Sequence, residues 1–179
     1  DFYKNGLFKG RFENIKVCAD EWNYSWGHSS SNAMLLSNAL QFHFFAKSGD
    51  KYHIRRAEFF MPVNEGMIEV EGTRVKVESS GEMFRLMQGH RGGKITDCAA
   101  DPSLDVLCTR HPAGLYISAV NRGSERKEIA VRGYHPVYAV HIETEEYSFI
   151  NNEFRVYETD VPAVSGHSVL FVRMAQDGT

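Results

Sequence analysis

The sequence predicts an α/β part followed by an all-β part, and two patterns along the chain indicate this. Before about residue 100, segments typical of a strand, a loop and a helix follow one another twice. After Asp101 and Pro102 the helical patterns stop, and short β-branched or aromatic runs alternate with turn-forming residues. The length of 179 residues allows one ordinary domain or two small ones. We therefore expect β/α units in residues 1–97 and a jelly-roll-like antiparallel β-sandwich in residues 98–179.

The first β/α unit begins with a strand that should end at Asp20, because its apolar residues alternate with polar ones. A polar and aromatic loop follows over residues 23–31, and Asn32 is placed to cap a helix that runs to about Lys47. The spacing of the apolar residues predicts a wide buried face on this helix. That face would contain Leu35, Leu36, Ala39, Leu40 and Phe44.

The second unit begins with HIRRAEFFMPVNEG, residues 53–66, an apolar segment that ends in Asn64 and Glu65. A loop containing EGTRVKVESS should lead from there to a helix capped by Ser80. Two β/α units are typical of a parallel sheet or barrel, but a closed barrel takes eight strands and about 250 residues. The first half is therefore expected to be an incomplete piece of a larger structure.

Six short strands are predicted in the second half of the chain. They are separated by turn formers, which is typical of an antiparallel sandwich. The predicted strands cover residues 104–110, 114–121, 127–133, 137–143, 153–158 and 168–174.

The composition limits the classes of partner. With 42% hydrophobic and 24% charged residues, the chain has enough apolar side chains for a core. A formal net charge of −3 gives no indication of binding to nucleic acid or to an anionic membrane. The most apolar run, residues 33–46, is too short to span a bilayer. The compartment is left open, with the cytoplasm slightly favoured over secretion.

Asp20 and Glu21 lie where the first strand should end, and aromatic residues follow them. In α/β barrels the chemistry lies at the carboxyl ends of the strands. Aromatic rings can stack on the C–H faces of a sugar, and a carboxylate can attack or stabilise its anomeric carbon. The alternative is structural: the acids accept backbone N–H groups and the tryptophans cover a barrel rim. The pattern alone leaves both interpretations open. The aromatic residues concerned are Trp22, Tyr24 and Trp26.

The motif DEWN, residues 20–23, resembles the nucleophile motif of the α-L-arabinofuranosidases of glycoside hydrolase family 51. These are retaining enzymes of a barrel-fold clan that uses two glutamates. NAMLLSNALQFHFF is similar to the helix after that motif, and the segment from AEFFMPVNEG to MFRLMQGHRGG is similar to the family's last barrel strand and helix. LYISAVNRG, INNEF and SVLFVRM are similar to its C-terminal β-sandwich. The resemblance implies the last two β/α units of a (β/α)8 barrel followed by a β-sandwich.

By this resemblance Glu21 is the nucleophile that removes α-L-arabinofuranosyl groups from arabinose-containing polysaccharides or oligosaccharides. Asp20 would be structural, because adjacent residues of a strand point to opposite faces. No metal or cofactor is implied, since two carboxylates carry the reaction, and homo-oligomers are common in the family. The residues expected to bind the sugar are Trp22, Asn23, Trp26 and Asn64.

The chain departs from the family in two places. A retaining glycosidase needs an acid/base carboxyl about 5–5.5 Å from the nucleophile. In the family it belongs to an Asn-Glu pair well before the nucleophile, and only about twenty residues precede Glu21 here. Asn64-Glu65 imitates that pair but comes after the nucleophile, so we interpret it as part of the rim. The chain is therefore expected to be partial and inactive alone.

A second departure concerns the substrate. Glu65, Gly66 and Met67 stand where the family has a sugar-contacting glutamine, which leaves arabinose specificity open. One alternative is another glycosidase of the clan, such as a β-xylosidase. The other is a non-catalytic carbohydrate-binding or structural β-sandwich module, in which DEWN is a coincidence.

Overall fold

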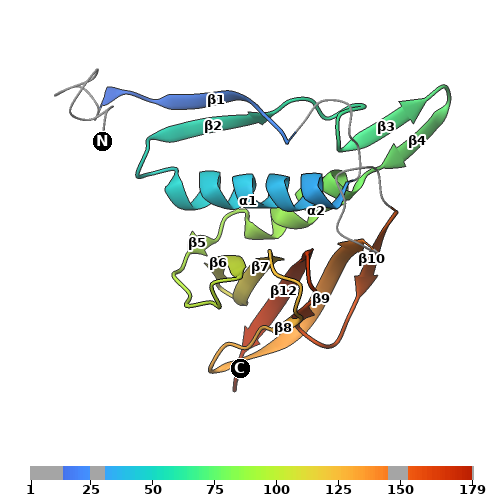
Figure 1. The fold of residues 1–179 in the computed structure, drawn as a ribbon. Coiled ribbons are helices and arrows are strands. Elements are labelled where there is room, and N and C mark those ends of the chain that lie inside the picture. Colours follow the sequence, from blue (N-terminus) through green and yellow to red (C-terminus); the bar gives the residue numbers. More distant parts are fainter. Residues whose placement is uncertain (1–13, 25–30, 145–152, 179) are drawn as a thin grey trace.

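The computed structural model describes residues 14–24, 31–144 and 153–178, which form three layers (Figure 1). Two helices, α1 (Asn32–Ser48) and α2 (Ser79–Met87), lie between a two-stranded sheet and a six-stranded sheet. Helix α1 contacts strands of both sheets. A helix covered on two sides needs apolar residues around most of its circumference, which is why α1 has no single polar face. None of the helices in the described ranges is both long and apolar enough to cross a membrane.

The two-stranded sheet is parallel and forms one β–α–β unit with α1. Strand β1 (Val17–Trp22) pairs with β2 (Ile54–Phe59). The pairing continues to Trp22 opposite Phe59, so the strand ends two residues later than Asp20. The predicted end was wrong because polar residues can occupy an exposed strand when a neighbouring strand supplies the hydrogen bonds.

Helix α1 begins one residue after its cap. The Ser31 hydroxyl accepts the N–H of Met34 at 3.1 Å, so Ser31 is the N-cap and the predicted cap Asn32 is the first helical residue. The Asn32 amide instead donates to the Thr144 hydroxyl at 2.7 Å. The expected burial of Phe44 was also wrong: this ring is exposed and stacks on Tyr52, because the apolar side chains of α1 exceed what its neighbours cover.

A β-hairpin occupies the segment that was predicted to be a loop before α2. Strand β3 (Ile68–Glu71) pairs antiparallel with β4 (Arg74–Val77). Gly72 has φ +60°, which suits the tight turn between them. The hairpin places valines on one face and charged residues on the other, a period of two that the loop prediction did not use.

Helix α2 also begins earlier than predicted. Its N-cap is Glu78, and the predicted cap Ser80 is buried inside the first turn. A 3-10 turn, η3 (Gln88–His90), extends the helix.

The six-stranded antiparallel sheet has the order β10-β9-β12-β7-β6-β5 and confirms a β-rich second half, consistent with a sandwich. A separate pair, β8 (Lys127–Glu128) and β11 (Ala163–Val164), lies beside it. The predicted strand 127–133 was wrong beyond residue 128. The strands of the large sheet are β5 (Lys94–Ile95), β6 (Leu104–His111), β7 (Gly114–Asn121), β9 (Tyr134–Thr144), β10 (Phe154–Glu158) and β12 (Ser168–Gln176).

Two apolar cores lie on opposite faces of the large sheet. On β12, Val169 and Phe171 pack against α1 and α2, whereas Leu170 and Val172 belong to the second core. Successive residues of β12 therefore face the two cores in turn, as expected for a strand that is buried on both faces. Residues 94–95 pair with β6, so the last residues of the first predicted unit take part in the sheet of the second. The boundary between residues 97 and 98 stays a prediction.

Candidate functional site

The register between β1 and β2 shifts at the two acids of the DEWN motif. Ala19 pairs with Ala57 and Trp22 with Phe59, so Asp20 and Glu21 together face the single residue Glu58. Such an extra residue re-aims the side chains of a strand. Asp20 and Glu21 are both exposed, between half-buried Ala19 and buried Trp22. The assignment of Asp20 to the opposite face of the strand stays a prediction.

An open cavity of about 300 Å³ lies beside this bulge. Its walls come from the carboxyl end of β1 and the residues that follow it, the loop after β2, and helix α1. Glu21 and Asn23, two of the predicted site residues, line the cavity together with Tyr24. Trp26, another predicted site residue, is outside the described residues. The remaining described lining residues are Trp22, Gln41, Phe60 and Glu65.

Asn23 connects the two loops that form the cavity wall. Its side-chain amide donates to the backbone carbonyl of Glu65 at 2.7 Å. Its side-chain oxygen accepts the Asn38 amide at 3.2 Å, and the same Asn38 amide also donates to the Ser80 hydroxyl at 3.1 Å. Asn38 and Ser80 are fully buried, so the hydrogen bond between them is shielded from competing water.

Trp22 supports the cavity from the helix side. Only 8% of its surface is exposed, and its ring makes edge-to-face contacts with Phe45 and Phe59 at centroid distances of 5.3 and 5.2 Å. A third ring, Phe84 of α2, lies 5.5 Å away. The packing role of Trp22 is therefore evident, and its role in shaping a sugar subsite stays a prediction.

Asn64 is not among the described residues that line the cavity. Its backbone has a turn conformation. Its φ is +62°, and its side-chain oxygen accepts the N–H of Val70 at 2.7 Å. This interaction ties the loop to strand β3. The neighbouring Glu65 lines the cavity in its place, and the binding role expected of Asn64 stays a prediction.

The charged side chains among the described residues of the cavity are acidic. Two carboxylates, Glu21 and Glu65, line it, and none of its described lining residues is a lysine, arginine or histidine. No group of His, Cys, Asp and Glu in the described ranges is arranged to hold a metal ion. Carboxylates and amides can bind sugar hydroxyls, and an exposed carboxylate can attack an electrophilic carbon.

A second polar constellation, which the sequence patterns did not indicate, lies between the helices and the large sheet. His43 Nδ1 is 2.6 Å from Asp105 Oδ1, and His43 Nε2 is 2.7 Å from Ser118 Oγ. Lys47 donates to the same Asp105 oxygen at 2.7 Å. Asp105 and Ser118 stand 62 and 75 residues from His43, so no local motif could have revealed the array.

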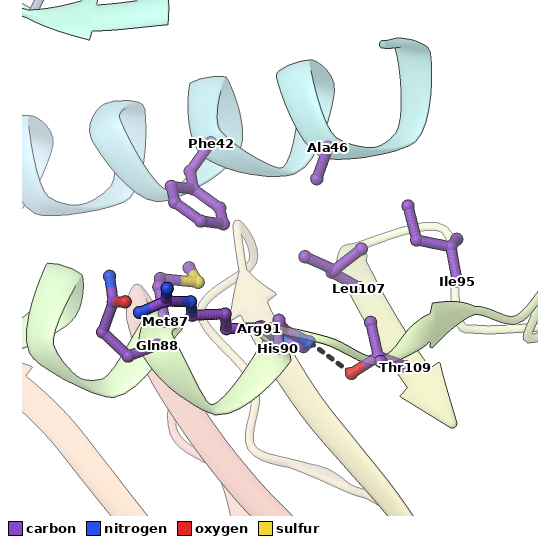
Figure 2. Close-up of a pocket in the computed structure, with 10 residues that line it drawn as sticks. Phe42, Ala46, Met87, Gln88, His90, Arg91, Ile95, Leu107 and Thr109 are labelled. Carbon is purple, nitrogen blue, oxygen red and sulfur yellow. Dashed lines mark hydrogen bonds between the residues drawn. The ribbon is translucent and has the colours of Figure 1, made fainter. Parts of the chain in front are cut away.

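The array continues through a second histidine. His90 Nε2 is 2.8 Å from Ser118 Oγ, and His90 Nδ1 is 2.9 Å from Thr109 Oγ1. Thr109 Oγ1 is in turn 3.1 Å from His111 Nε2. Figure 2 shows His90 and Thr109 on the wall of a mostly apolar cavity of about 280 Å³, below Phe42 of α1.

Ionised Asp105 determines the direction of every hydrogen bond in this array. Since Asp105 can only accept, His43 Nδ1 carries the proton and His43 Nε2 accepts the Ser118 hydroxyl. Ser118 Oγ then accepts from His90 Nε2, whose Nδ1 accepts the Thr109 hydroxyl. In this arrangement each buried histidine is neutral.

The pKa values agree with neutral histidines. Burial lowers the pKa of His43, and burial together with the nearby His43 and His111 lowers the pKa of His90 to about 3. The hydrogen bond from His43, followed by Lys47, holds the pKa of Asp105 well below its usual range. Because Ser118 is completely buried, this array is a structural connection between the helices and the sheet rather than an accessible nucleophile.

Solved structures of similar fold include glycoside hydrolases. The chain is similar to the GH51 arabinofuranosidase from Xanthomonas axonopodis pv. citri, with a TM-score of 0.67 and 13% identity over 92% of this chain and 42% of that one. It is similar to the α-L-arabinofuranosidase from Thermotoga maritima in its arabinose complex, with a TM-score of 0.68 and 14% identity over 94% and 44%. A GH30 endoxylanase from Clostridium papyrosolvens C71 matches with a TM-score of 0.56 and 12% identity over 95% and 44%.

At these identities the likeness is one of fold. No protein-family model and no curated protein matches the sequence. The chain spans less than half the length of each of the three structures. The described residues therefore have the fold of the corresponding part of glycoside hydrolases.

Proposed function

We propose that this chain is the C-terminal part of a retaining glycoside hydrolase and that Glu21 is its nucleophile. The observation that carries the proposal is the position of Glu21. It lies on a bulge at the carboxyl end of a parallel strand and lines an open cavity of about 300 Å³. Catalytic groups of α/β barrels lie at this end of their strands, and ligand pockets begin at about 300 Å³.

In the proposed reaction, the Glu21 carboxylate attacks the anomeric carbon while a second carboxylic acid protonates the departing oxygen. Water then releases the sugar from the covalent intermediate, with the second group acting as base. We assign that second group to barrel strands outside this chain. Among the described residues, β1 and β2 pair only with each other, so each has an edge on which further parallel strands can add. Residues 1–97 would then complete a barrel, and residues 98–179 would form its accompanying sandwich.

α-L-Arabinofuranosyl groups are the substrate that we favour, because two of the similar structures are named as arabinofuranosidases. Asn23 would bind the sugar, and Trp22 would hold the floor of its subsite. Xylosyl substrates are a second candidate, which the similarity to a GH30 endoxylanase supports.

Covalent labelling tests the nucleophile directly. An aryl 2-deoxy-2-fluoro-α-L-arabinofuranoside and the corresponding fluoroxyloside would be incubated with the full-length protein, and the labelled peptide would be mapped by mass spectrometry. We expect one sugar adduct on Glu21, and none on the Glu21→Gln variant. Which of the two reagents labels the protein distinguishes the two substrates.

The isolated 179-residue chain should not turn over either aryl glycoside, because the proposal assigns the second carboxyl group to strands outside it. Turnover by that chain alone would contradict the division of the site proposed here. Unchanged turnover in the Glu21→Gln full-length protein would instead indicate a non-catalytic carbohydrate-binding or structural module.

A further inference from the structure

We propose that the turn between β6 and β7 borders a second glycan-binding site, in which Arg110 and Tyr134 bind the carboxylate of a uronic acid residue. This inference goes beyond the proposed function and rests on it only in taking the ligand to be part of a glycan. The site belongs to the six-stranded sheet, whereas the Glu21 cavity borders the two-stranded sheet, and the helices lie between the two sheets (Figure 1).

A cavity of about 450 Å³ lies beside this turn. Small-molecule sites have volumes of about 300–1,000 Å³, so a sugar ring fits in it. The described lining residues contain one permanent cation, Arg110, and no aspartate or glutamate. The ring of Tyr134 and the small residues of the turn offer surfaces for the C–H groups of a sugar. The other described lining residues are His111, Pro112, Ala113, Gly114 and Gln176.

A hydrogen bond places the Arg110 guanidinium at this cavity. Arg110 Nη1 donates to the Tyr134 hydroxyl at 3.1 Å, and both residues line the cavity. This bond uses one of the five N–H groups of the guanidinium. The Tyr134 hydroxyl accepts it and still has its own O–H to donate. Donors from two side chains therefore meet at one place, and an anionic acceptor is their complement.

The charge of Arg110 is not balanced by its neighbours in the sheet. Lys94 of β5 lies directly opposite Arg110, and side chains at such positions share a face. Like charges at directly opposite positions destabilise a sheet. Within the ranges that the structure describes, neither side chain forms an ion pair with a carboxylate. A bound anion would relieve the repulsion between the two cations.

The other edge of the same sheet has the opposite arrangement. Arg155 of β10 lies directly opposite Glu143 of β9, and their side chains form an ion pair at 3.2 Å. Asp177, which follows the last lining residue in the chain, does not serve Arg110 in this way, because its carboxylate pairs with His135 at 2.9 Å. A ligand carboxylate would therefore supply to Arg110 what Glu143 supplies to Arg155, and the planar guanidinium suits bidentate binding of that group.

The backbone around Arg110 is fixed before a ligand binds. Gly114 has φ +132°, which favours glycine, and a Cβ there would collide with the carbonyl oxygen of Met174. Arg110 pairs with Leu115, which is buried in the second core on the face of the sheet away from the helices. A site on such a rigid support loses little conformational freedom when it binds a ligand.

NMR titration of the full-length, ¹⁵N-labelled protein tests the site. The ligands are methyl β-D-glucuronide, methyl β-D-glucoside and inorganic phosphate, and the amide signal of Gly114 reports on this cavity while that of Asn23 reports on the Glu21 cavity. At Gly114 we expect the glucuronide to bind at least about tenfold tighter than the glucoside or phosphate. This preference over the glucoside should decrease between about 20 mM and 500 mM NaCl, because salt screens the attraction.

Three variants locate the effect. Arg110→Gln should weaken glucuronide binding at Gly114 at least about fivefold, because the charged donors are lost. Tyr134→Phe keeps the ring and should weaken it about twofold to fivefold, because it removes the hydroxyl that positions Arg110. Arg155→Gln removes the same charge from the far edge of the same sheet and is the matched control, which should leave the affinity unchanged.

The outcomes separate this inference from the proposed function. Unchanged glucuronide affinity in Arg110→Gln and Tyr134→Phe would overturn the site, and equal affinities for phosphate and glucuronide would overturn its assignment to a glycan. Labelling of Glu21 by a fluorosugar without any glucuronide shift at Gly114 would refute this inference alone. Glucuronide binding at Gly114 without labelling of Glu21 would support this site and count against the proposed nucleophile.

Discussion

The cavity at Glu21 and the buried array at Ser118 contain similar chemical groups in opposite surroundings. Ser118 has a histidine at 2.7 Å, and that histidine has an aspartate at 2.6 Å, which are distances typical of a nucleophile and its base. Yet Ser118 has 0% exposure and a histidine on each side of its hydroxyl. Glu21 has a less distinctive set of neighbours but lies on the wall of an open cavity.

The difference shows that partner geometry alone does not identify a catalytic site. In the buried array every donor meets an acceptor, so no hydrogen-bonding capacity is left for a substrate. Such fully satisfied networks stabilise one arrangement of the elements they join. At the cavity, the side chain of Glu21 is exposed and can exchange water for sugar hydroxyls. We therefore expect variants at Glu21 to change activity and variants at Ser118 to change stability.

The largest effect should come from Glu21→Gln in the full-length enzyme. Loss of the nucleophile should reduce kcat by on the order of 10⁴-fold. The melting temperature should stay close to that of the wild type, since the side chain is exposed. Steady-state kinetics and thermal unfolding check both expectations. Asp20→Asn is the matched neighbour and should retain activity within about tenfold; an equal loss in both variants would remove the distinction between these acids.

Ser118→Ala should instead lower the stability of the protein and leave kcat per folded molecule unchanged. It leaves His43 Nε2 and His90 Nε2 without their shared partner in a buried site. Each unsatisfied group costs about 1–3 kcal/mol, so we expect the free energy of unfolding to fall by roughly 2–4 kcal/mol. Denaturant titration measures this change, with exposed Ser124→Ala as the control. If kcat per folded molecule fell while stability did not change, the array would be functional and the comparison wrong.

The buried array should weaken as the pH is lowered, at a higher pH than the one at which carboxylates become protonated. The pKa of His90 is lowered to about 3 in the fold, against about 6.5 in an unfolded chain. The contribution of neutral His90 to the free energy of unfolding is therefore complete above pH 6.5 and is lost as the pH falls from 6.5 toward 3. Between pH 7 and pH 5 this amounts to about 2 kcal/mol for His90. The lowered pKa of His43 adds in the same direction.

Denaturant titrations at pH 7, 6 and 5 measure this loss. A His90→Gln variant should show a shallower dependence of stability on pH, whereas a variant at His135, which is exposed, should follow the wild type. Equal slopes for all three proteins would show that the buried histidines are not the groups that titrate.

The smallest effect should come from Lys47→Gln at the solvent end of the array. Lys47 and Asp105 are each about one-third exposed, so solvent screens their attraction. Removing such a pair typically costs about 0.2–1 kcal/mol. The difference from wild type, measured by denaturant titration, should shrink further in 0.5 M salt. A loss as large as that of Ser118→Ala would mean that Lys47 belongs to the buried part of the network.

Local patterns in the sequence determined most of the elements. The alternation before Asp20, the apolar run after Asn32 and the β-branched segments after residue 102 each predicted an element that the structure contains. The errors are local: the helix caps are shifted, and the β3–β4 hairpin was interpreted as a loop. Caps and hairpins depend on single hydrogen bonds, such as that from Met34 to Ser31, which compete with equally good neighbouring choices.

Of the site, the sequence by itself determined which residue types follow the first strand, and with them the expectation that Glu21 meets a sugar. Only the tertiary structure decided that Asp20 and Glu21 share a bulge, that Glu65 lines the same cavity as Glu21, and that Asp105, His43 and Ser118 meet in the interior. The physical reason is that a bulge depends on the register with β2, and a buried hydrogen bond depends on the approach of segments more than sixty residues apart. Neither leaves a periodic signal in the chain.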